Sequence, residues 1–241
     1  MIRERLSATG PLAEENFRWR AGEITRLEGF SDAVFAFALT LLVVSLEVPR
    51  TFDELIRAMK GFPAFGVCFA ILAVVWHDHC RFFRRYGLQN SWMTFLNFVL
   101  LFVVLFYIYP LKFLFFTTFA GAAVPAEQGR TLLLIYGLGY AAIFLTFLLM
   151  YIHAWKRRED LALNALELMK TRQSIIDHLA MTSVAVLSVA MALLLPVRMV
   201  ALAGWFYFVI PVYYTIAGTI YGRREKRMQE AARESPAASG A

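Results

Sequence analysis

Three consecutive polar residues, His77, Asp78 and His79, stand near the end of an apolar stretch and have side chains that can bind metal ions. Imidazoles and carboxylates are common ligands of zinc. On a helix, however, residues one and two positions apart point in different directions. The usual helical pair, two histidines four residues apart with a glutamate between them, does not occur in the sequence. Hydrogen bonds to other helices at a membrane edge are therefore the preferred interpretation, and no metal site is predicted here.

Asp32, Asp177 and His178 also lie within or at the start of apolar stretches. Ionisable groups in such places are costly and usually mark a function or a tightly satisfied contact. Asp32 and His79 would form a proton relay in an ion-coupled transporter, which is one open interpretation. A membrane-embedded enzyme at 77–79 is another, with less to support it. The sequence has no nucleophile elbow, phosphate-binding glycine loop or recognisable serine–histidine spacing, so neither catalytic residues nor a cofactor is predicted.

The segment 26–49 combines polar residues with a regular apolar pattern. At about 100° per helical residue, one stripe contains Ala33, Phe37, Thr40, Leu41 and Val44. The carboxylate of position 32 lies about 140° from the phenyl ring of position 37, away from that stripe. It would accept hydrogen bonds from a neighbouring helix or another subunit, with serine 31 of a second copy or histidine 79 as possible donors, or it would cap a later helix start. On spacing alone, ordinary helix packing is the simpler interpretation of the stripe.

The composition places these residues in a membrane protein. Of the 241 residues, 59% are hydrophobic and 17% are charged, whereas a soluble domain has about 45–50% and about 25%. This surplus excludes one soluble core, and the aromatic content of 15% excludes disorder. Cys68 and Cys80 lie in one apolar stretch and imply no disulfide. The net charge of +6 indicates membrane orientation, and nucleic acid is not expected as a partner.

The hydropathy pattern predicts an all-α integral membrane protein with six transmembrane helices. Each span needs about 20 mostly apolar residues. The predicted spans are Gly29–Val48, Phe62–Phe82, Trp92–Phe116, Leu132–Trp155, Ile175–Leu195 and Met199–Tyr221. Cytoplasmic loops are enriched in Lys and Arg, and 18 of these residues lie on one side of this topology against 6 on the other. Both termini are therefore predicted to be cytoplasmic, in a multi-pass membrane protein.

The first span carries a resemblance to a known family. The pattern of Arg26, Phe30, Ser31 and Asp32, followed by the Ala-Val-Phe-Ala run at 33–36, closely resembles the signature of the bacterial transmembrane-protein-175 potassium channels. The similarity continues through Thr40-Leu41-Leu42 to Pro49. Further matching residues lie in the second and third spans: Trp76, His79, Phe83, Asn97 and Pro110.

This resemblance implies a homotetrameric, potassium-preferring cation channel in the lipid bilayer, with a central pore lined by the first helix. It implies constrictions at Phe37, Leu41 and Val44, with transient potassium near the Thr40 hydroxyls and no cofactor. It also implies that a set of residues braces helices within and between subunits: Arg26, Phe30, Ser31, Asp32, Trp76 and His79. The Thr-Val-Gly-Tyr-Gly filter of other potassium channels does not occur. With the family included, pore lining replaces packing as the preferred interpretation of the stripe.

The family pattern usually has Ile or Leu where this chain has Phe37. Four phenyl rings would close the pore at rest or present faces that attract cations, and the sequence leaves both open. The predicted organisation is a cytoplasmic, interfacial segment at 1–25, a six-span channel domain at 26–222, and a cytoplasmic tail at 223–241 that is first basic and then disordered.

Overall fold

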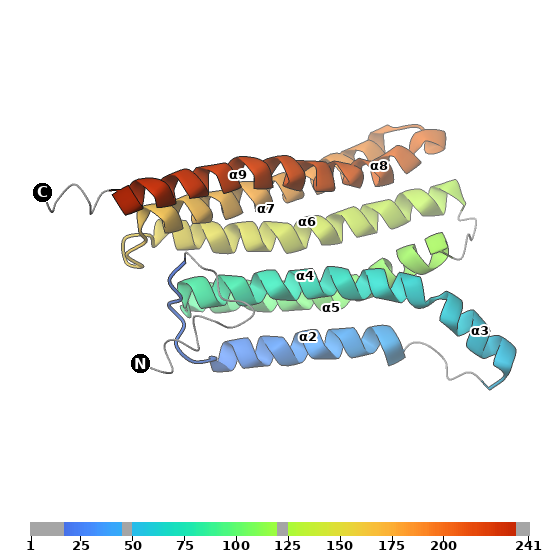
Figure 1. Ribbon diagram of the computed structural model, residues 1–241. Helices are drawn as coiled ribbons and strands as arrows, with labels where there is room; N and C mark the ends of the chain where they lie inside the picture. Colours follow the sequence, from blue (N-terminus) through green and yellow to red (C-terminus); the bar gives the residue numbers. More distant parts are fainter. Residues whose placement is uncertain (1–16, 45–49, 120–124, 235–241) are drawn as a thin grey trace, which may run out of the picture.

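The computed structural model describes residues 17–44, 50–119 and 125–234, and every regular element in these ranges is helical. Long helices run side by side as a bundle (Figure 1). The elements are α2 (Arg26–Val44), α3 (Phe52–Lys60), α4 (Phe62–Tyr86), α5 (Ser91–Phe119), α6 (Ala126–Lys156), α7 (Ala165–Leu194), η1 (Val197–Met199), α8 (Ala201–Trp205), η2 (Phe206–Phe208) and α9 (Val209–Glu234).

Within the described residues, five helical stretches are long and apolar enough to cross a membrane. They are Phe62–Tyr86, Ser91–Phe119, Gln128–Lys156, Ala165–Leu194 and Val197–Met228. The second to sixth predicted spans fall on these stretches, so the prediction of a multi-pass, all-α membrane protein is confirmed. The first predicted span coincides with α2 as far as Val44, and its last residues, 45–48, lie outside the described part.

Several helix boundaries differ from the predicted spans. Helix α7 begins at Ala165, well before the predicted Ile175, because Asn164 and Glu167 form a capping box. The Asn164 side chain accepts from the Glu167 backbone N–H at 2.9 Å, and the Glu167 carboxylate accepts from the Asn164 N–H at 3.0 Å. Helix α9 continues to Glu234, across the predicted boundary between the channel domain and the tail. Residues 235–241 lie outside the described part.

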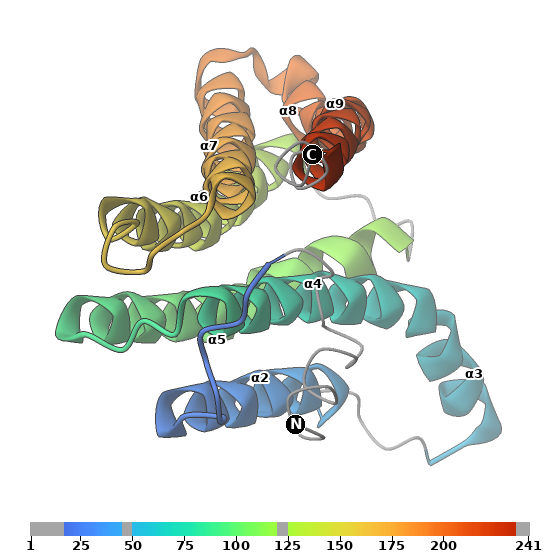
Figure 2. The same ribbon diagram turned by 60° about the vertical axis from the view of Figure 1, so that its left-hand side comes forward.

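The helices divide into two groups. Helices α2, α4 and α5 contact one another on one side, while α6 and α7 pack together on the other with α9 beside them, as Figures 1 and 2 show. Packing of α5 against α6 joins the groups. The start of α2, the α4–α5 and α6–α7 connections and the end of α9 lie at one end of the bundle (Figure 1). The four cation-rich regions assigned to one membrane side include these segments.

At that end, the segment before α2 is fastened to both helix groups. Phe17 is buried against Tyr86, with ring centroids 5.7 Å apart, and the Arg85 guanidinium lies 4.8 Å from the Phe17 ring centre. The Arg20 guanidinium donates to the Glu167 carboxylate at 2.6 Å and to the Leu161 carbonyl at 2.8 Å. This segment therefore ties the α4–α5 connection to the α6–α7 connection immediately before α2 begins.

The α4–α5 connection is shaped to receive this segment. Gly87 ends α4 with φ = 59°, a left-handed conformation that favours glycine. A Cβ at this position would lie 3.3 Å from the Arg20 backbone carbonyl atoms. The Arg20 N–H donates to the Arg84 carbonyl at 3.1 Å. Glycine therefore allows both the turn and the close backbone approach.

We expect Glu167→Gln to lower the melting temperature of the purified protein by about 5–10 °C. The Arg20 and Glu167 side chains are almost completely buried, and breaking such an ion pair costs about 3 kcal/mol or more. Thermal unfolding followed by size-exclusion chromatography measures the shift. The control is Arg157→Gln in the exposed Arg157–Asp160 pair, where the expected change is close to zero. Equal melting temperatures for Glu167→Gln and the unsubstituted protein would show that the Arg20–Glu167 ion pair does not stabilise the fold.

Candidate functional site

Helix α2 has one buried and one exposed face. Ser31, Phe35, Ala38 and Leu42 are each at most 2% exposed, and they recur at the four- and three-residue spacing of one helical stripe. This stripe packs against α4 and α5. The packing fixes the rotation of α2 about its own axis, so the opposite face of the helix is left exposed by the rest of the chain.

The exposed face contains most of the residues predicted to line a pore. Ala33, Phe37 and Thr40 are exposed, and the Phe37 side chain retains 57% of its accessible surface. Leu41 is half-buried at the edge of this face. The side chain of Val44, at the end of the helix, lies outside the described part. The exposed face therefore offers one aromatic ring and one hydroxyl among small apolar residues.

The Thr40 hydroxyl donates to the Phe37 backbone carbonyl at 2.7 Å. A hydroxyl has one hydrogen and two acceptor lone pairs, so this bond uses its donor and leaves its acceptors unoccupied by that contact. The exposed oxygen of Thr40 is consequently suited to face a cation rather than an anion.

Asp32 lies beside α4, off the exposed stripe, as its helical angle predicts. The Trp76 indole N–H donates to the Asp32 carboxylate at 2.8 Å, and the Cys80 sulfur lies 3.8 Å from the same oxygen. The partner of Asp32 in this chain is thus the indole of Trp76, and His79 bonds to a different group. Trp76 and Cys80 are one helical turn apart, so both point toward α2.

A buried chain of hydrogen bonds joins α2, α5 and α4. The Asn97 side-chain amide donates to the Ser31 hydroxyl at 2.9 Å, and the Ser31 hydroxyl donates to the Leu27 carbonyl at 2.8 Å. The Asn97 amide oxygen lies 2.7 Å from His79 Nε2. Because an amide oxygen only accepts, Nε2 must carry the hydrogen in this arrangement. All three side chains are at most 1% exposed.

The His79 ring is held between aromatic neighbours. Its centroid lies 5.5 Å from that of Phe35 on α2 and 4.7 Å from that of Phe83 on α4. Its Nδ1 atom is buried and has no hydrogen-bond partner among the described residues. The ring is packed tightly, and its hydrogen bond within the described part is to Asn97. Asn97 matches the family pattern but was not predicted to be a bracing residue. A single amide within an apolar span was the sequence signal that could have indicated this role.

The remaining bracing candidates lie apart from these two groups. Arg26 is exposed, and Phe30 is half-exposed with its ring edge toward Phe98 at 5.8 Å. Asp78, which was not a bracing candidate, lies within α4, 3.6 Å from Arg81 and 3.8 Å from His77. Among the described residues, no group of three or more His, Cys, Asp or Glu side chains could hold a metal ion. The metal interpretation of 77–79 therefore gains no support.

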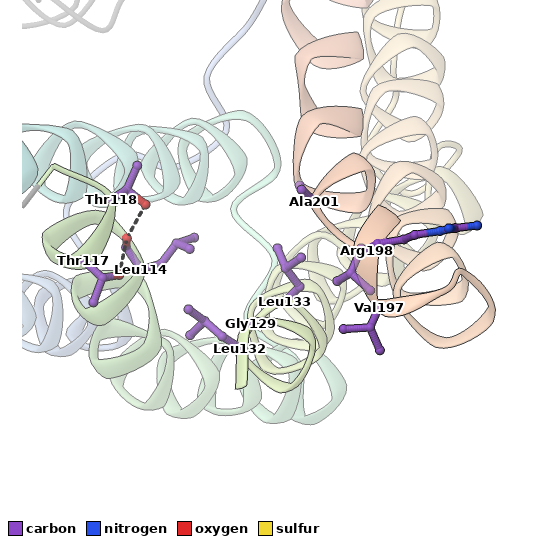
Figure 3. Close-up of a pocket in the computed structure, with 11 residues that line it drawn as sticks. Leu114, Thr117, Thr118, Gly129, Leu132, Leu133, Val197, Arg198 and Ala201 are labelled. Atoms are coloured by element: carbon purple, nitrogen blue, oxygen red, sulfur yellow. Dashed lines mark hydrogen bonds between the residues drawn. The ribbon is translucent and has the colours of Figure 1, made fainter. Parts of the chain in front are cut away.

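A separate pocket of about 440 Å³ lies at the other end of the bundle. Figure 3 shows Thr117 and Thr118 of α5, Leu132 and Leu133 of α6, and Arg198 of η1 around it. Its walls are mostly apolar, and none of its lining residues belongs to α2. The pocket is thus distinct from the exposed face that carries Phe37 and Thr40.

The fold and these contacts define a multi-pass, all-helical membrane protein whose first described helix is held by buried polar contacts. The family model "Endosomal/lysosomal potassium channel TMEM175" matches residues 26–107, which include α2, α3, α4 and most of α5. A potassium channel of Marivirga tractuosa is 40% identical over 231 residues, covering 88% of this chain and 94% of the relative. A potassium channel of Chamaesiphon minutus is 30% identical over 142 residues, covering 56% and 65%. The chain belongs to the TMEM175 family.

Solved structures agree with this assignment. A crystal structure of the potassium channel MtTMEM175, a threonine-to-alanine variant bound to a nanobody–MBP fusion protein, superposes with a TM-score of 0.76. It is 38% identical and covers 89% of this chain and 98% of that one. The potassium-selective TMEM175 homologue from Chamaesiphon minutus has a TM-score of 0.56 at 25% identity, covering 79% and 95%. The family is one of ion channels and not of enzymes, as the sequence predicted.

We expect Asn97→Leu to lower the melting temperature by about 5–10 °C. Leucine removes both hydrogen bonds: His79 Nε2 is left buried without its partner, at a cost of about 1–3 kcal/mol, and the Ser31 hydroxyl, which still donates to Leu27, loses its buried donor. Ser183→Ala is the control, because the Ser183 hydroxyl is exposed and bonds only to its own helix at Leu179. A double substitution of Ser31 and Asn97 should cost less than the sum of the single changes; additive effects would show that the residues do not form one network.

Proposed function

We propose that this chain forms a homotetrameric, potassium-preferring cation channel that passes ions passively through a central pore lined by α2. The observation that carries the proposal is the exposed α2 face at Ala33, Phe37 and Thr40, opposite a face buried by α4 and α5. Family membership supports the same conclusion, since the relatives are potassium channels.

The exposed face is suited to contact with further copies of itself. Gly29, Ala33 and Ala36 are exposed on it, and small residues allow membrane helices to approach closely. Arg26 and Phe30 lie at the same end of the helix and are available to a neighbouring subunit. A helix that faced only lipid would gain nothing from this row of small side chains. Four α2 helices around one axis would use the small residues for contact and direct Phe37, Thr40 and Leu41 toward the axis.

Selectivity in such a pore would come from desolvation. Rings of Phe37, Leu41 and Val44 are apolar, and an apolar constriction loses water and blocks ions until it widens. A cation that passes must shed part of its hydration shell. Potassium holds its water less strongly than sodium, so the rings favour potassium, and the acceptor oxygens of Thr40 replace part of the lost water. Four Phe37 rings would also present faces that attract cations.

The two polar groups on α2 would hold this pore helix in register. The Ser31–Asn97–His79 chain and the Asp32–Trp76 bond approach α2 from α5 and α4 and restrain its rotation. Rotation by one residue, about 100°, would replace Phe37 with a neighbouring side chain. Ser31 and Asp32 on α2 and their partners Trp76 and His79 on α4 are therefore proposed as positioning residues. Arg26 and Phe30 are proposed to act between subunits.

The proposed location is the cell membrane, with both termini cytoplasmic. The start of α2, the α4–α5 and α6–α7 connections and the end of α9 share one end of the bundle and carry Arg20, Arg84, Arg85, Arg157 and Arg158 among their residues. Clustering of positive charge at one end is what the positive-inside rule requires of the cytoplasmic face.

Ion flux into liposomes tests the proposal against a coupled transporter. In the alternative, Asp32 and His79 would relay protons, but they belong to separate hydrogen-bond groups in this chain. A channel passes potassium down its gradient with no counter-substrate and no fixed proton stoichiometry. Purified protein in potassium-loaded vesicles should therefore release potassium once a protonophore allows protons to carry the compensating charge. Obligatory exchange with protons or another ion would overturn the channel.

We expect Phe37→Ala to raise the single-channel conductance several-fold and to reduce the preference for potassium over sodium. Removal of four phenyl rings widens the narrowest proposed ring, so ions keep more of their water. Planar-bilayer recordings in potassium and in sodium measure both effects. Phe102→Ala is the matched control, because Phe102 on α5 is 71% exposed and lies outside the proposed pore. An unchanged current–voltage relation for Phe37→Ala would place the constriction elsewhere.

Asp32→Ala should weaken tetramer assembly more than ion selectivity. The alanine variant loses the acceptor for the Trp76 indole, so α2 is less firmly oriented when subunits meet. Asp32→Asn keeps an acceptor oxygen and should retain more tetramer, while Trp76→Phe removes the donor and should resemble Asp32→Ala. Size-exclusion chromatography with light scattering gives the oligomeric state. A stable alanine-variant tetramer with altered selectivity would assign Asp32 to the pore instead.

A further inference from the structure

Helix α3 presents an apolar face that the described part of the chain does not cover. Phe52, Leu55, Ile56 and Met59 are all exposed, with 74% of the Phe52 surface and 58% of the Met59 surface accessible. Their spacing of three and four residues confines them to an arc of about 100°. The helix is too short to span a bilayer, since nine residues cover about 14 Å. An exposed apolar stripe on a short helix calls for a partner beyond the described residues.

The position of α3 relates this stripe to the membrane boundary. Gly61 ends α3 and begins α4, which is one of the stretches long enough to cross a membrane. Helix α3 therefore ends where this membrane-crossing stretch begins. In both views it lies at the end of the bundle and turns away from the α4 axis (Figures 1 and 2). Exposed Phe62 and Phe119 lie at the adjoining ends of α4 and α5 and extend the apolar surface there.

The two caps of α3 make it a persistent helix despite its length. The Thr51 hydroxyl accepts from the Glu54 N–H at 3.2 Å, and the Glu54 carboxylate accepts from the Thr51 N–H at 3.3 Å. At the other end, the Gly61 N–H donates to the Ala58 carbonyl at 3.0 Å. A Cβ on Gly61 would lie 2.8 Å from the Phe116 ring, so glycine lets the junction pack closely against α5. The apolar stripe is thus held at a defined position relative to α4 and α5.

We propose that α3 lies in the interface of the membrane on the side opposite the two termini. There it inserts Phe52, Leu55, Ile56 and Met59 among lipid acyl chains. An amphipathic helix at this level lies with its apolar face in the boundary between headgroups and acyl chains. The exposed apolar surface of α3 continues onto Phe62, the first residue of α4. Four side chains are also far fewer than a stable protein interface uses, at about 800 Å² and 20–30 residues per partner. Lipid is therefore the partner that this face fits.

The charges of α3 specify the kind of lipid surface. The sequence of the helix has two acidic and two basic residues, so it carries no net charge. Electrostatic attraction to anionic lipids requires an excess of Lys and Arg. Insertion should consequently be driven by apolar area and should be the same in phosphatidylcholine vesicles with or without phosphatidylglycerol.

Spin labels on the two faces of α3 test this proposal. Single cysteines replace Phe52, Met59, Asp53 or Lys60 in the full chain, with Cys68→Ala and Cys80→Ser as background, and each protein is reconstituted in phosphatidylcholine vesicles. Relaxation by oxygen, which concentrates in lipid, is compared with relaxation by a water-soluble nickel chelate. Labels at 52 and 59 should show an oxygen-to-nickel ratio several-fold above that at 53 and 60. This measurement does not depend on ion conduction, so its result is separate from that of the flux experiments.

Two results would overturn the proposal. Equal ratios at all four positions would place α3 in water, and poor access of both reagents to 52 and 59 would indicate a protein partner or a second copy. A reporter at Ile56 gives an independent measurement, in which Phe52→Ala together with Met59→Ala should lower the ratio because apolar area is removed. Alanine preserves helix propensity, and size-exclusion profiles identify any variant that fails to fold.

Discussion

The rotation of α2 depends on satisfying three polar side chains in a place without water. A buried hydroxyl, amide and imidazole each cost several kilocalories per mole when unpaired in hydrocarbon, and the Ser31–Asn97–His79 chain pairs them across three helices. This pairing is directional, unlike the surrounding apolar contacts. Once Ser31 faces Asn97, Phe35, Ala38 and Leu42 must be buried, and the face carrying Phe37 must be exposed. The polar chain therefore determines which α2 side chains the described part of the chain leaves exposed.

The sequence predicted the elements better than it predicted their partners. Hydropathy depends on residue type over long windows, so five spanning stretches were placed well. The stripe with Phe37 and Thr40 followed from helical geometry alone. The fifth span was predicted from its apolar residues and so starts at Ile175, ten residues after the Asn164–Glu167 capping box begins helix α7. The first predicted span extends beyond the described part of α2, and its last turn stays a prediction.

Partners far apart in the sequence were the least predictable part. The angle of Asp32 correctly turned it away from the stripe, but the donors considered for it were Ser31 of another subunit and His79, not Trp76. The structure selects Trp76, because Trp76 and Cys80 face α2 while His79, on an adjoining face of α4, reaches Asn97. Neighbouring positions on α4 thus serve different partners: Cys80 faces Asp32, and His79 faces Asn97. Similarly, nothing local in the sequence connects Arg20 with Glu167, 147 residues later.

The two ends of the bundle restrain α2 in different ways. Before the helix, Phe17 and Arg20 are anchored to both helix groups by an aromatic contact and a buried ion pair. After α2, the short helix α3 is capped at both ends and has an uncovered apolar face. Its close contact, at Gly61, is with α5. Protein contacts therefore fix one end, whereas lipid contacts would hold the other under the proposed insertion. Any movement that widens the Phe37 ring would then be easier at the α3 end, because acyl chains yield more readily than a buried ion pair.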